Sequence, residues 1–314
     1  MINIDFKSIR DLLKAFPDEQ TCINHLEQLR WNGNVVSPFD ETSKVYKCAG
    51  NKYKCKNTGK YFNVRTATLF DNTKIELQTW FLAIYLITSH KKGISSVQLG
   101  KDLNVTQKTA WFMNHRIRNC FGIADNEGRN EKMGGGGQMV EVDETYVGGK
   151  VKNFKRSKHK KIEDGELDVN ANKSCVMGFL ERGGKLRMTI STRREILKST
   201  VENVCEDSVL MTDCSGAYHF ADNHFSAHEK IDHAKKEYVR EKFFHTNSIE
   251  GVFSLFDRGY IGIYHYMSTK HMQKYLDEFA FRYNTRKITT IARFNTLLQY
   301  STTRLTYNNL ICKQ

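Results

Sequence analysis

The segment Gln138-Met-Val-Glu-Val-Asp143-Glu-Thr-Tyr-Val-Gly-Gly149 decides the fold of the second half of this chain. It is rich in β-branched residues, follows the glycine run 134–137 and ends on a glycine pair. This pattern predicts a strand that leads into a turn. Asp143 lies near the middle of the strand, where an unpaired buried carboxylate is costly. The segment therefore predicts a carboxylate that meets a partner or a bound cation.

Two later segments carry carboxylates in similarly apolar settings. A short strand-like run, residues 208–213, ends on Asp213, and Glu250 opens an apolar segment with helical spacing. Taken singly, each acid is better explained as a surface group near the end of a strand or helix. Two strand-borne aspartates followed by a helix-borne glutamate, however, suit a site that holds two divalent metal ions for phosphodiester chemistry.

With these motifs, the chain resembles the DDE transposases of insertion sequences, specifically the ISXO-like branch. The resemblance runs from about residue 22 to residue 286 and keeps the motifs in order. They are Val142-Asp143-Glu-Thr-Tyr-Val-Gly-Gly149, Thr212-Asp213, His245-Thr-Asn-Ser-Ile-Glu250-Gly, Arg258-Gly-Tyr-Ile-Gly262, Tyr264-His265, and Lys270-His271 through Tyr275-Leu-Asp-Glu-Phe279-Ala-Phe-Arg-Tyr-Asn284.

The resemblance implies an α/β chain in which a zinc ribbon and a helix-turn-helix precede an RNase H-like catalytic domain. It implies that Asp143, Asp213 and Glu250 are both the catalytic residues and the ligands of Mg²⁺ or Mn²⁺. The expected activity is that of a transposase, which cuts transposon ends and joins the freed 3′-hydroxyl to target DNA. The expected partner is double-stranded DNA, both the terminal inverted repeats and the target, bound by a homo-oligomer.

Composition favours a polyanionic partner. The 314 residues include 48 Lys+Arg and 35 Asp+Glu, a formal charge of +13 with pI about 9.3. A generically basic protein would show the same balance, so charge alone leaves both possibilities open. No apolar run approaches the roughly 20 residues of a transmembrane helix, and the N-terminus lacks signal-peptide organisation. We expect a bacterial, cytoplasmic, nucleoid-associated protein whose eight Cys are free thiols.

Residues 1–70 are expected to form N-terminal helices followed by a degenerate ribbon. In the family the ribbon has two Cys-x-x-Cys pairs, whereas here Ser37, Asp40 and Thr58 stand at three of the four ligand positions. Only Cys55 remains, and one thiolate cannot close a tetrahedral zinc site. We therefore expect a β module without zinc, held by packing on helix residues 26–31 and carrying a basic surface. The residues expected to pack are Val45, Tyr53, Tyr61, Phe62 and Val64.

Residues 71–122 are expected to form the helix-turn-helix region. Thr106 is a suitable N-cap for a helix that continues to Arg118. An ordinary helical hairpin would give the same pattern, and the resemblance favours DNA binding. The residues expected to meet base edges are Gln107, Lys108 and Thr109, and those expected to lie nearer phosphates are Arg116 and Arg118.

The remaining boundaries follow from loss of periodicity and from the glycines. Residues 123–137 are expected to be a linker, 138–290 the catalytic domain and 291–314 a C-terminal tail. Within the catalytic domain, a basic stretch that includes Lys155 and Arg156 is explained equally well as a contact to DNA backbone or as a solvated loop.

Two further residues of the catalytic domain need comment. Glu144 follows Asp143 directly and should face the opposite side of the strand. Asp257 stands seven positions after Glu250, close to two helical turns, where the family usually has a basic residue. Arg258, next along, is expected to reach DNA and to compensate in part.

Three functions remain open at this point. The first is an active transposase, which the three retained carboxylates favour. The second is a decayed or domesticated DNA-binding protein with an inactive RNase H-like domain, which Asp257 and the missing cysteines favour. The third is a nuclease that acts without strand transfer.

Overall fold

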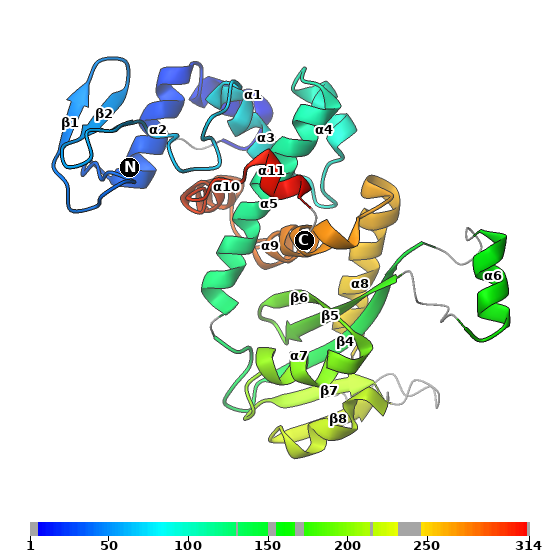
Figure 1. The fold of residues 1–314 in the computed structure, drawn as a ribbon. Coiled ribbons are helices and arrows are strands. Elements are labelled where there is room, and N and C mark those ends of the chain that lie inside the picture. Colours follow the sequence, from blue (N-terminus) through cyan, green and yellow to red (C-terminus); the bar gives the residue numbers. More distant parts are fainter. Residues whose placement is uncertain are drawn as a thin grey trace. The chain divides into compact units, whose positions relative to one another are not determined.

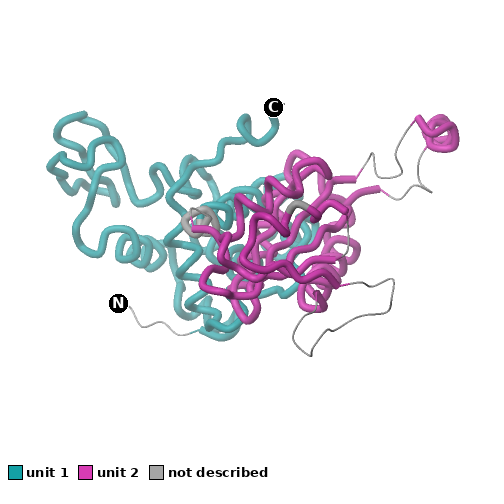
Figure 2. Tube along the Cα trace, turned by 90° about the horizontal axis from the view of Figure 1, so that it is seen from below, with its two compact units in different colours: residues 1–124, 285–314 teal, residues 125–284 magenta. Residues whose placement is uncertain are grey.

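A computed structural model describes residues 6–129, 131–149, 155–166, 173–213, 216–231 and 246–312. The protein is a mixed α/β chain that divides into two compact units, residues 1–124 with 285–314, and residues 125–284 (Figures 1 and 2). The first division falls within the expected linker 123–137. The second lies at 284/285, before the expected boundary at 290, and assigns the last thirty residues to the first unit. No helix in the described ranges is both long and apolar enough to cross a bilayer.

The first unit is mainly helical. Short polar side chains begin several of its helices: Asp18 accepts a hydrogen bond from the Thr21 amide at 2.7 Å, and Ser95 accepts one from the Gln98 amide at 3.1 Å. The helices are α1 (Ile9–Ala15), α2 (Glu19–Trp31), α3 (Leu77–Ser89), α4 (Ser96–Asp102), α10 (Thr290–Gln299) and α11 (Tyr307–Ile311), with α5 (Gln107–Arg129) continuing into the second unit.

An aromatic cluster joins the N-terminal helices to α10. Phe294 of α10 lies 5.2 Å from Phe6 and 5.4 Å from Phe81, and Phe16 lies 4.8 Å from Phe81, centroid to centroid. All four rings are almost completely buried. Residues that the sequence predicted as a tail therefore complete the core of the first unit.

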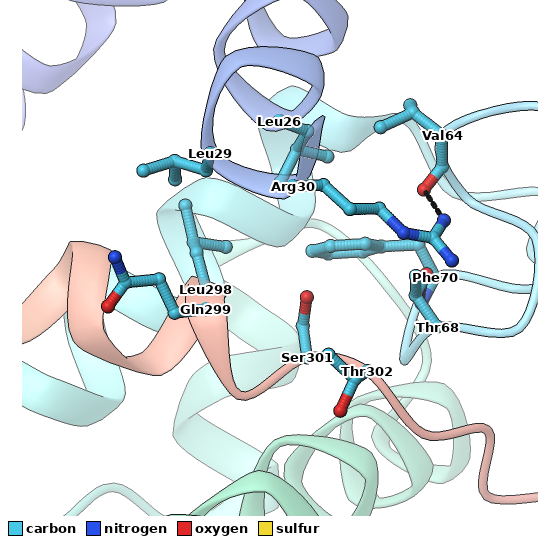
Figure 3. Close-up of a pocket in the computed structure, with 10 residues that line it drawn as sticks. All are labelled: Leu26, Leu29, Arg30, Val64, Thr68, Phe70, Leu298, Gln299, Ser301 and Thr302. Atoms are coloured by element: carbon cyan, nitrogen blue, oxygen red, sulfur yellow. Dashed lines mark hydrogen bonds between the residues drawn. The ribbon is translucent and has the colours of Figure 1, made fainter. Parts of the chain in front are cut away.

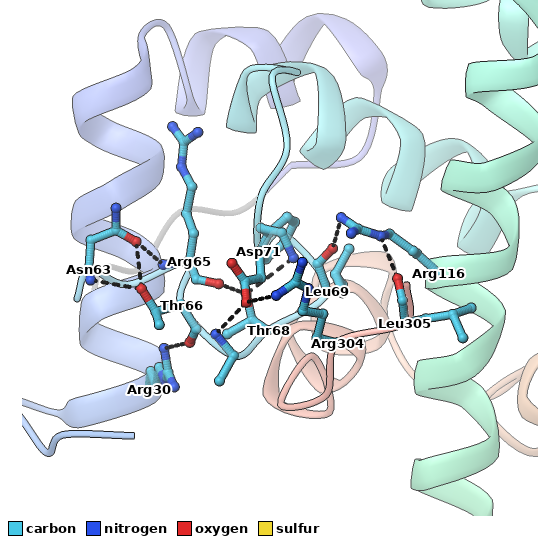
Figure 4. A network of polar contacts seen from close by, with 12 residues as sticks. Arg30, Asn63, Arg65, Thr66, Thr68, Leu69, Asp71, Arg116, Arg304 and Leu305 are labelled. Atoms are coloured by element: carbon cyan, nitrogen blue, oxygen red, sulfur yellow. Dashed lines mark hydrogen bonds and ion pairs between the residues drawn. The ribbon is translucent and has the colours of Figure 1, made fainter. Parts of the chain in front are cut away.

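Polar contacts fix the segment that connects the β module to the helices. Arg30 of α2 donates to the carbonyl oxygens of Val64 at 2.9 Å and Thr66 at 3.0 Å, beside a cavity of about 120 Å³ between α2 and α10 (Figure 3). Arg116 of α5 donates to the carbonyl oxygens of Leu69 at 2.9 Å and Leu305 at 3.1 Å (Figure 4). Buried guanidinium groups thus hold both the connecting segment and the C-terminal segment.

The β module is a three-stranded antiparallel sheet, in the order β1 (Val45–Cys48), β2 (Lys52–Cys55) and β3 (Tyr61–Phe62). Its inner face packs on α2, where Trp31 lies 5.2 Å from Tyr53 and 6.1 Å from Phe62. This confirms the expected packing for Tyr53 and Phe62. Tyr61 was expected to pack as well, but it is 59% exposed because strand alternation places it on the other face.

The second unit is built on a five-stranded sheet in the order β6-β5-β4-β7-β8. β4, β5 and β6 are antiparallel neighbours, whereas β4, β7 and β8 run parallel (Figure 1). Along the chain, the strand β4 is followed by the β5–β6 hairpin, a helix, two further strands and the C-terminal helices of the unit. The strands are β4 (Met139–Gly148), β5 (Lys173–Glu181), β6 (Leu186–Ser191), β7 (Val209–Asp213) and β8 (Ala227–Ile231).

Helices cover both faces of this sheet. On one face, α8 (Asn247–Gly259), a short π-helix (Tyr260–Tyr264) and α9 (Thr269–Asn284) bury Val176 and Leu180 of β5. On the other, α7 (Ile196–Asn203) and the 3₁₀ segments Arg193–Glu195 and Gly216–Asn223 accompany Val140 and Val142 of β4. A separate helix, α6 (Arg156–Glu163), has no buried residue. The alternation along β4 assigns Glu141 and Asp143 to the α8 face.

The glycine run 134–137 is not a free tether. Its amides donate to the Glu181 carboxylate at 2.9 Å, to the Ser208 hydroxyl at 2.9 Å and to the Asp207 carboxylate at 2.7 Å. All four glycines have positive φ, which is unstrained only for this residue. The run therefore anchors the start of β4 to the end of β5 and to the segment before β7.

Candidate active site

The sheet register places the two aspartates side by side. The parallel pairing of β4 with β7 runs Met139 to Val209, Val140 to Leu210 and Glu141 to Met211. These pairs end at Glu141 and Met211; the same register, continued by two residues, would set Asp143, in the middle of β4, opposite Asp213, the last residue of β7. Both side chains then point to the face that α8 covers.

The helix that carries Glu250 is brought close by a glycine. Gly178 of β5 is the register partner of Asp143, and a Cβ there would lie 2.8 Å from Ile249 Cδ1 and 2.9 Å from Phe253 Cζ of α8. Only a residue without a side chain permits this approach. Glu250, one residue after Ile249, is exposed in the first turn of α8, and its carboxylate accepts from the Thr246 hydroxyl at 3.3 Å.

A buried glutamate on β4 ties this helix to the sheet. Glu141 is fully buried, and its carboxylate accepts a hydrogen bond from the Ile249 amide at 3.0 Å. It also accepts from Arg182 at 3.0 Å, which offsets the cost of burying its charge. Sequence reasoning missed Glu141, although its position two residues before Asp143 already predicted a side chain on the same face.

Negative charges surround Asp143. Burial is the main reason that its pKa is raised to about 7; a 2.8 Å hydrogen bond from the Glu144 amide opposes the rise, and the charges of Glu144, Asp213 and Glu250 add to it. The charges of the other two carboxylates that the sequence singled out thus act on Asp143.

Glu144 takes the opposite side of the strand, as alternation predicts. Its carboxylate accepts a hydrogen bond from Tyr218 at 2.7 Å, and Tyr218 belongs to the cluster under α7. Burial and the charge of Asp213 nevertheless raise the pKa of Glu144. Glu144 is therefore part of the electrostatic surroundings of the site, a role that alternation alone does not indicate.

A polar network supports the end of β7 on the side away from Asp213. The buried Thr212 hydroxyl lies 2.8 Å from Nε2 of His228, whose Nδ1 lies 2.5 Å from the Asp222 carboxylate. Lys230 donates to the same carboxylate at 2.6 Å. This network ties β8 to β7 one residue before Asp213.

The donor chemistry fits a hard divalent cation. Carboxylate oxygens are the ligands that Mg²⁺ and Mn²⁺ prefer, and a cation would relieve the repulsion that raises the pKa of Asp143. Among the described residues, no three His, Cys, Asp or Glu side chains form a group that could hold a metal ion by themselves. Mg²⁺ commonly takes only one or two protein carboxylates and keeps several waters.

The expected DNA-contacting residues of α5 divide into two groups. Gln107 and Lys108 are exposed at the start of the helix, where Thr106 accepts from the Thr109 amide at 3.2 Å and so acts as the predicted N-cap. Gln107 also donates to Ser96 of α4 at 2.9 Å. Of the residues expected to contact DNA in this region, those at the start of α5, next to α4, are thus the exposed ones.

Arg116 and Arg118, expected near phosphates, are instead only 5% and 3% exposed. The guanidinium of Arg116 donates to carbonyl oxygens inside the first unit. The expectation failed because the middle of α5 is buried on every side, and a basic residue there is recruited to satisfy buried backbone carbonyls.

The other basic candidates are exposed. Lys155 and Arg156 stand at the start of α6, which also carries Lys158, Lys160 and Lys161. Arg258 is exposed near the end of α8, and so is Asp257 on the side of the helix that carries Glu250. The acidic departure seen in the sequence therefore faces solvent rather than the core. His245, another residue of the motif, lies outside the described residues.

The ribbon positions that would carry zinc ligands meet around Cys55. Burial raises the pKa of the Cys55 thiol, but hydrogen bonds from Ser37, Ser43 and Thr58 outweigh it and bring the pKa down to about 6. Both Cys55 and Ser37 are completely buried, and the Asp40 carboxylate accepts from Asn57 at 2.8 Å. Hydroxyl groups thus surround the one thiol that remains.

These observations define an α/β protein with acidic side chains on a mixed five-stranded sheet, and comparisons with known proteins show what it resembles. Residues 134–284 match the family described as the ISXO2-like transposase domain. This match confirms, for residues 134–284, the resemblance found in the sequence.

A relative from Halobacterium salinarum, described as an uncharacterized protein in transposable element ISH50, is 26% identical over 283 residues. The match covers 86% of this chain and 92% of the relative. Similarity to that protein thus extends well beyond the transposase domain.

Proposed function

We propose that this protein is a DNA transposase whose RNase H-like second unit cuts the ends of an insertion sequence and joins them to target DNA. The observation that carries the proposal is the β4–β7 register, which sets Asp143 beside Asp213 and under the helix that bears Glu250. The sheet order, with three antiparallel strands followed by two parallel ones, supports the RNase H-like assignment.

The chemistry is two exchanges of phosphorus–oxygen bonds. Water first attacks the phosphorus at the transposon end, and the 3′ oxygen leaves as a hydroxyl. That 3′-hydroxyl then attacks a phosphorus of target DNA, whose own 3′ oxygen leaves. Mg²⁺ or Mn²⁺ held by Asp143, Asp213 and Glu250 would activate the attacking oxygen and stabilise the leaving one. Glu141 and Gly178 position the helix that carries Glu250.

Recognition of the base sequence is assigned to the first unit, and contacts to the DNA backbone to the second. The exposed start of α5, with Gln107, Lys108 and Thr109, would read base edges at the inverted repeats. Lys155, Arg156 and Arg258 would contact backbone phosphates. Several chains would assemble on the two transposon ends, and the protein would act on the nucleoid in the cytoplasm.

The deciding experiment is a strand-transfer assay. Purified protein is incubated with Mg²⁺, a target plasmid and DNA carrying the inverted repeats that flank its gene. We expect joined products with the wild type. For Asp213→Asn, which removes a ligand charge at nearly constant volume, we expect at least a hundredfold less cleavage with unchanged end binding. Normal cleavage by the variant would remove Asp213 from the site.

One observation favours a second function, that of a DNA-binding protein whose catalytic unit has decayed. Asp257 presents a negative charge to solvent on the Glu250 side of α8. End binding without any cleavage by the wild type, in Mg²⁺ and in Mn²⁺, would establish this alternative. Cleavage without joining would instead indicate a nuclease.

A further inference from the structure

The outer face of the three-stranded sheet combines exposed aromatic rings with lysines. The antiparallel register aligns Tyr46 of β1, Lys54 of β2 and Tyr61 of β3 in one row across the sheet. Tyr46 is 43% exposed and Tyr61 is 59% exposed, whereas Tyr53 and Phe62 on the inner face are 4% and 3% exposed. The two faces of this small sheet are thus both aromatic, but only one of them is covered.

The lysines on this face lie close to the rings. Nζ of Lys44 lies 5.5 Å from the Tyr46 ring centroid, and Nζ of Lys54 lies 5.6 Å from that of Tyr61. Lys52 and Lys56 continue the same face by strand alternation. From residue 44 to residue 62 the chain contains six Lys and no Asp or Glu. The outer face therefore offers two aromatic rings for stacking, each with a lysine beside it, and the surrounding sequence contains no acidic residue.

We propose that this outer face binds single-stranded DNA, with bases stacked on Tyr46 and Tyr61 and the adjoining phosphates paired with Lys44 and Lys54. Aromatic side chains on a basic surface bind unpaired nucleotides with little sequence preference, because every base has a π-face. In a duplex the base faces are already stacked on one another, so the rings find partners only where strands are open. The surface thus complements the duplex-reading start of α5.

A simpler explanation is that the lysines only protect the edge strands from pairing with another chain. That role is met by the lysines alone and does not require exposed tyrosines. Only the proposal of DNA binding gives the tyrosine rings a role, so the test changes the rings.

The test is a binding titration without cleavage. Full-length protein is titrated in a metal-free buffer, with fluorescence anisotropy, against labelled oligothymidylate of about 12 nucleotides and against a duplex of equal length. For Tyr46→Leu/Tyr61→Leu we expect at least tenfold weaker binding of the single strand and less than twofold change for the duplex. The matched control, Tyr46→Phe/Tyr61→Phe, keeps both rings and should bind as the wild type does. Because the readout is binding alone, the outcome does not depend on the carboxylate site.

A charge variant tests the phosphate contacts without altering the rings. Lys54→Gln should weaken single-strand binding and reduce the slope of log K against log salt by about 0.7, the value for one phosphate contact on a single strand. An unchanged slope, an unchanged affinity of the Leu variant, or an equal loss for both kinds of DNA would each overturn the proposal. Thermal unfolding of every variant verifies that the β module remains folded. If Tyr46→Leu/Tyr61→Leu does not fold, the result for Lys54→Gln alone decides whether the proposal holds.

Discussion

Asp143 illustrates how one residue can link stability to the site. Its carboxyl has a pKa of about 7 in the folded chain, against an ordinary value of 3.8, mainly because it is buried. Above pH 7 the group is charged in both the folded and unfolded chain, so the cost of burying the charge is fully present. As the pH falls below 7 the folded chain takes up a proton, and the cost disappears by about pH 4.

We therefore predict that Asp143→Asn stabilises the metal-free protein above pH 7. The gain should be a few kcal/mol, at about 1.4 kcal/mol per pKa unit, and it should vanish on acidification towards pH 4. Thermal unfolding between pH 4 and pH 8 measures it. Mg²⁺ should raise the melting temperature of the wild type but not that of the variant. If the variant's gain in free energy of unfolding did not depend on pH, Asp143 would not be buried in its charged form.

Gly178 controls how closely α8 approaches the sheet. Gly178→Ala should lower the free energy of unfolding by about 1–3 kcal/mol, because the new methyl group would displace Ile249 and Phe253. The matched control is Gly251→Ala, on an exposed turn of α8 with nothing within 4 Å of its added Cβ. That change should instead stabilise by up to about 1 kcal/mol through helix propensity. Similar effects from both substitutions, measured by urea unfolding, would contradict the close approach.

At the scale of elements, the start of α5 carries the expected base recognition. Gln107→Ala/Lys108→Ala should weaken binding to the transposon end by about tenfold or more, and binding to random duplex DNA much less. Base contacts confer specificity, whereas phosphate contacts only position the protein. Both DNAs are compared at one salt concentration. Equal losses would reduce this helix to a general basic surface.

In the β module we expect side-chain packing to take the place of a structural metal ion. We expect no stoichiometric zinc by elemental analysis, and no loss of protease resistance in residues 36–70 on addition of chelator. The reason is the donor set around Cys55, where hydroxyls replace thiolates, together with the Trp31–Tyr53–Phe62 cluster. About one zinc per chain, lost together with the fold of the module, would show that the site has been rebuilt.

At the scale of the whole molecule, the C-terminal residues 285–314 belong to the same unit as the N-terminal residues 1–124. Phe294→Ala should cost the first unit about 3–5 kcal/mol, because the ring is fully buried among Phe6, Phe16 and Phe81. Ile311→Ala, at a 49% exposed position of α11, is the control and should have little effect. Differential scanning calorimetry of the full chain would follow both. A chain unaffected by Phe294→Ala would restore the view of this segment as a tail.

The sequence by itself determined local features of the second unit. Strand alternation predicted that Asp143 and Glu144 would lie on opposite faces of β4, and the apolar spacing after Glu250 predicted α8. These features depend on local periodicity, which short-range backbone geometry imposes on any chain.

Only the tertiary structure decided which residues share a surface. Arg116 and Arg118 look like surface bases in the sequence but are buried, and the Arg116 guanidinium donates to carbonyl oxygens distant in the chain. The last thirty residues join the first unit because Phe294 completes a core begun by Phe6 and Phe16. Glu141 becomes important only once α8 presents an unpaired amide to it. In each case the deciding partner lies far away in sequence, and only the packed chain brings it within the few ångströms over which these interactions act.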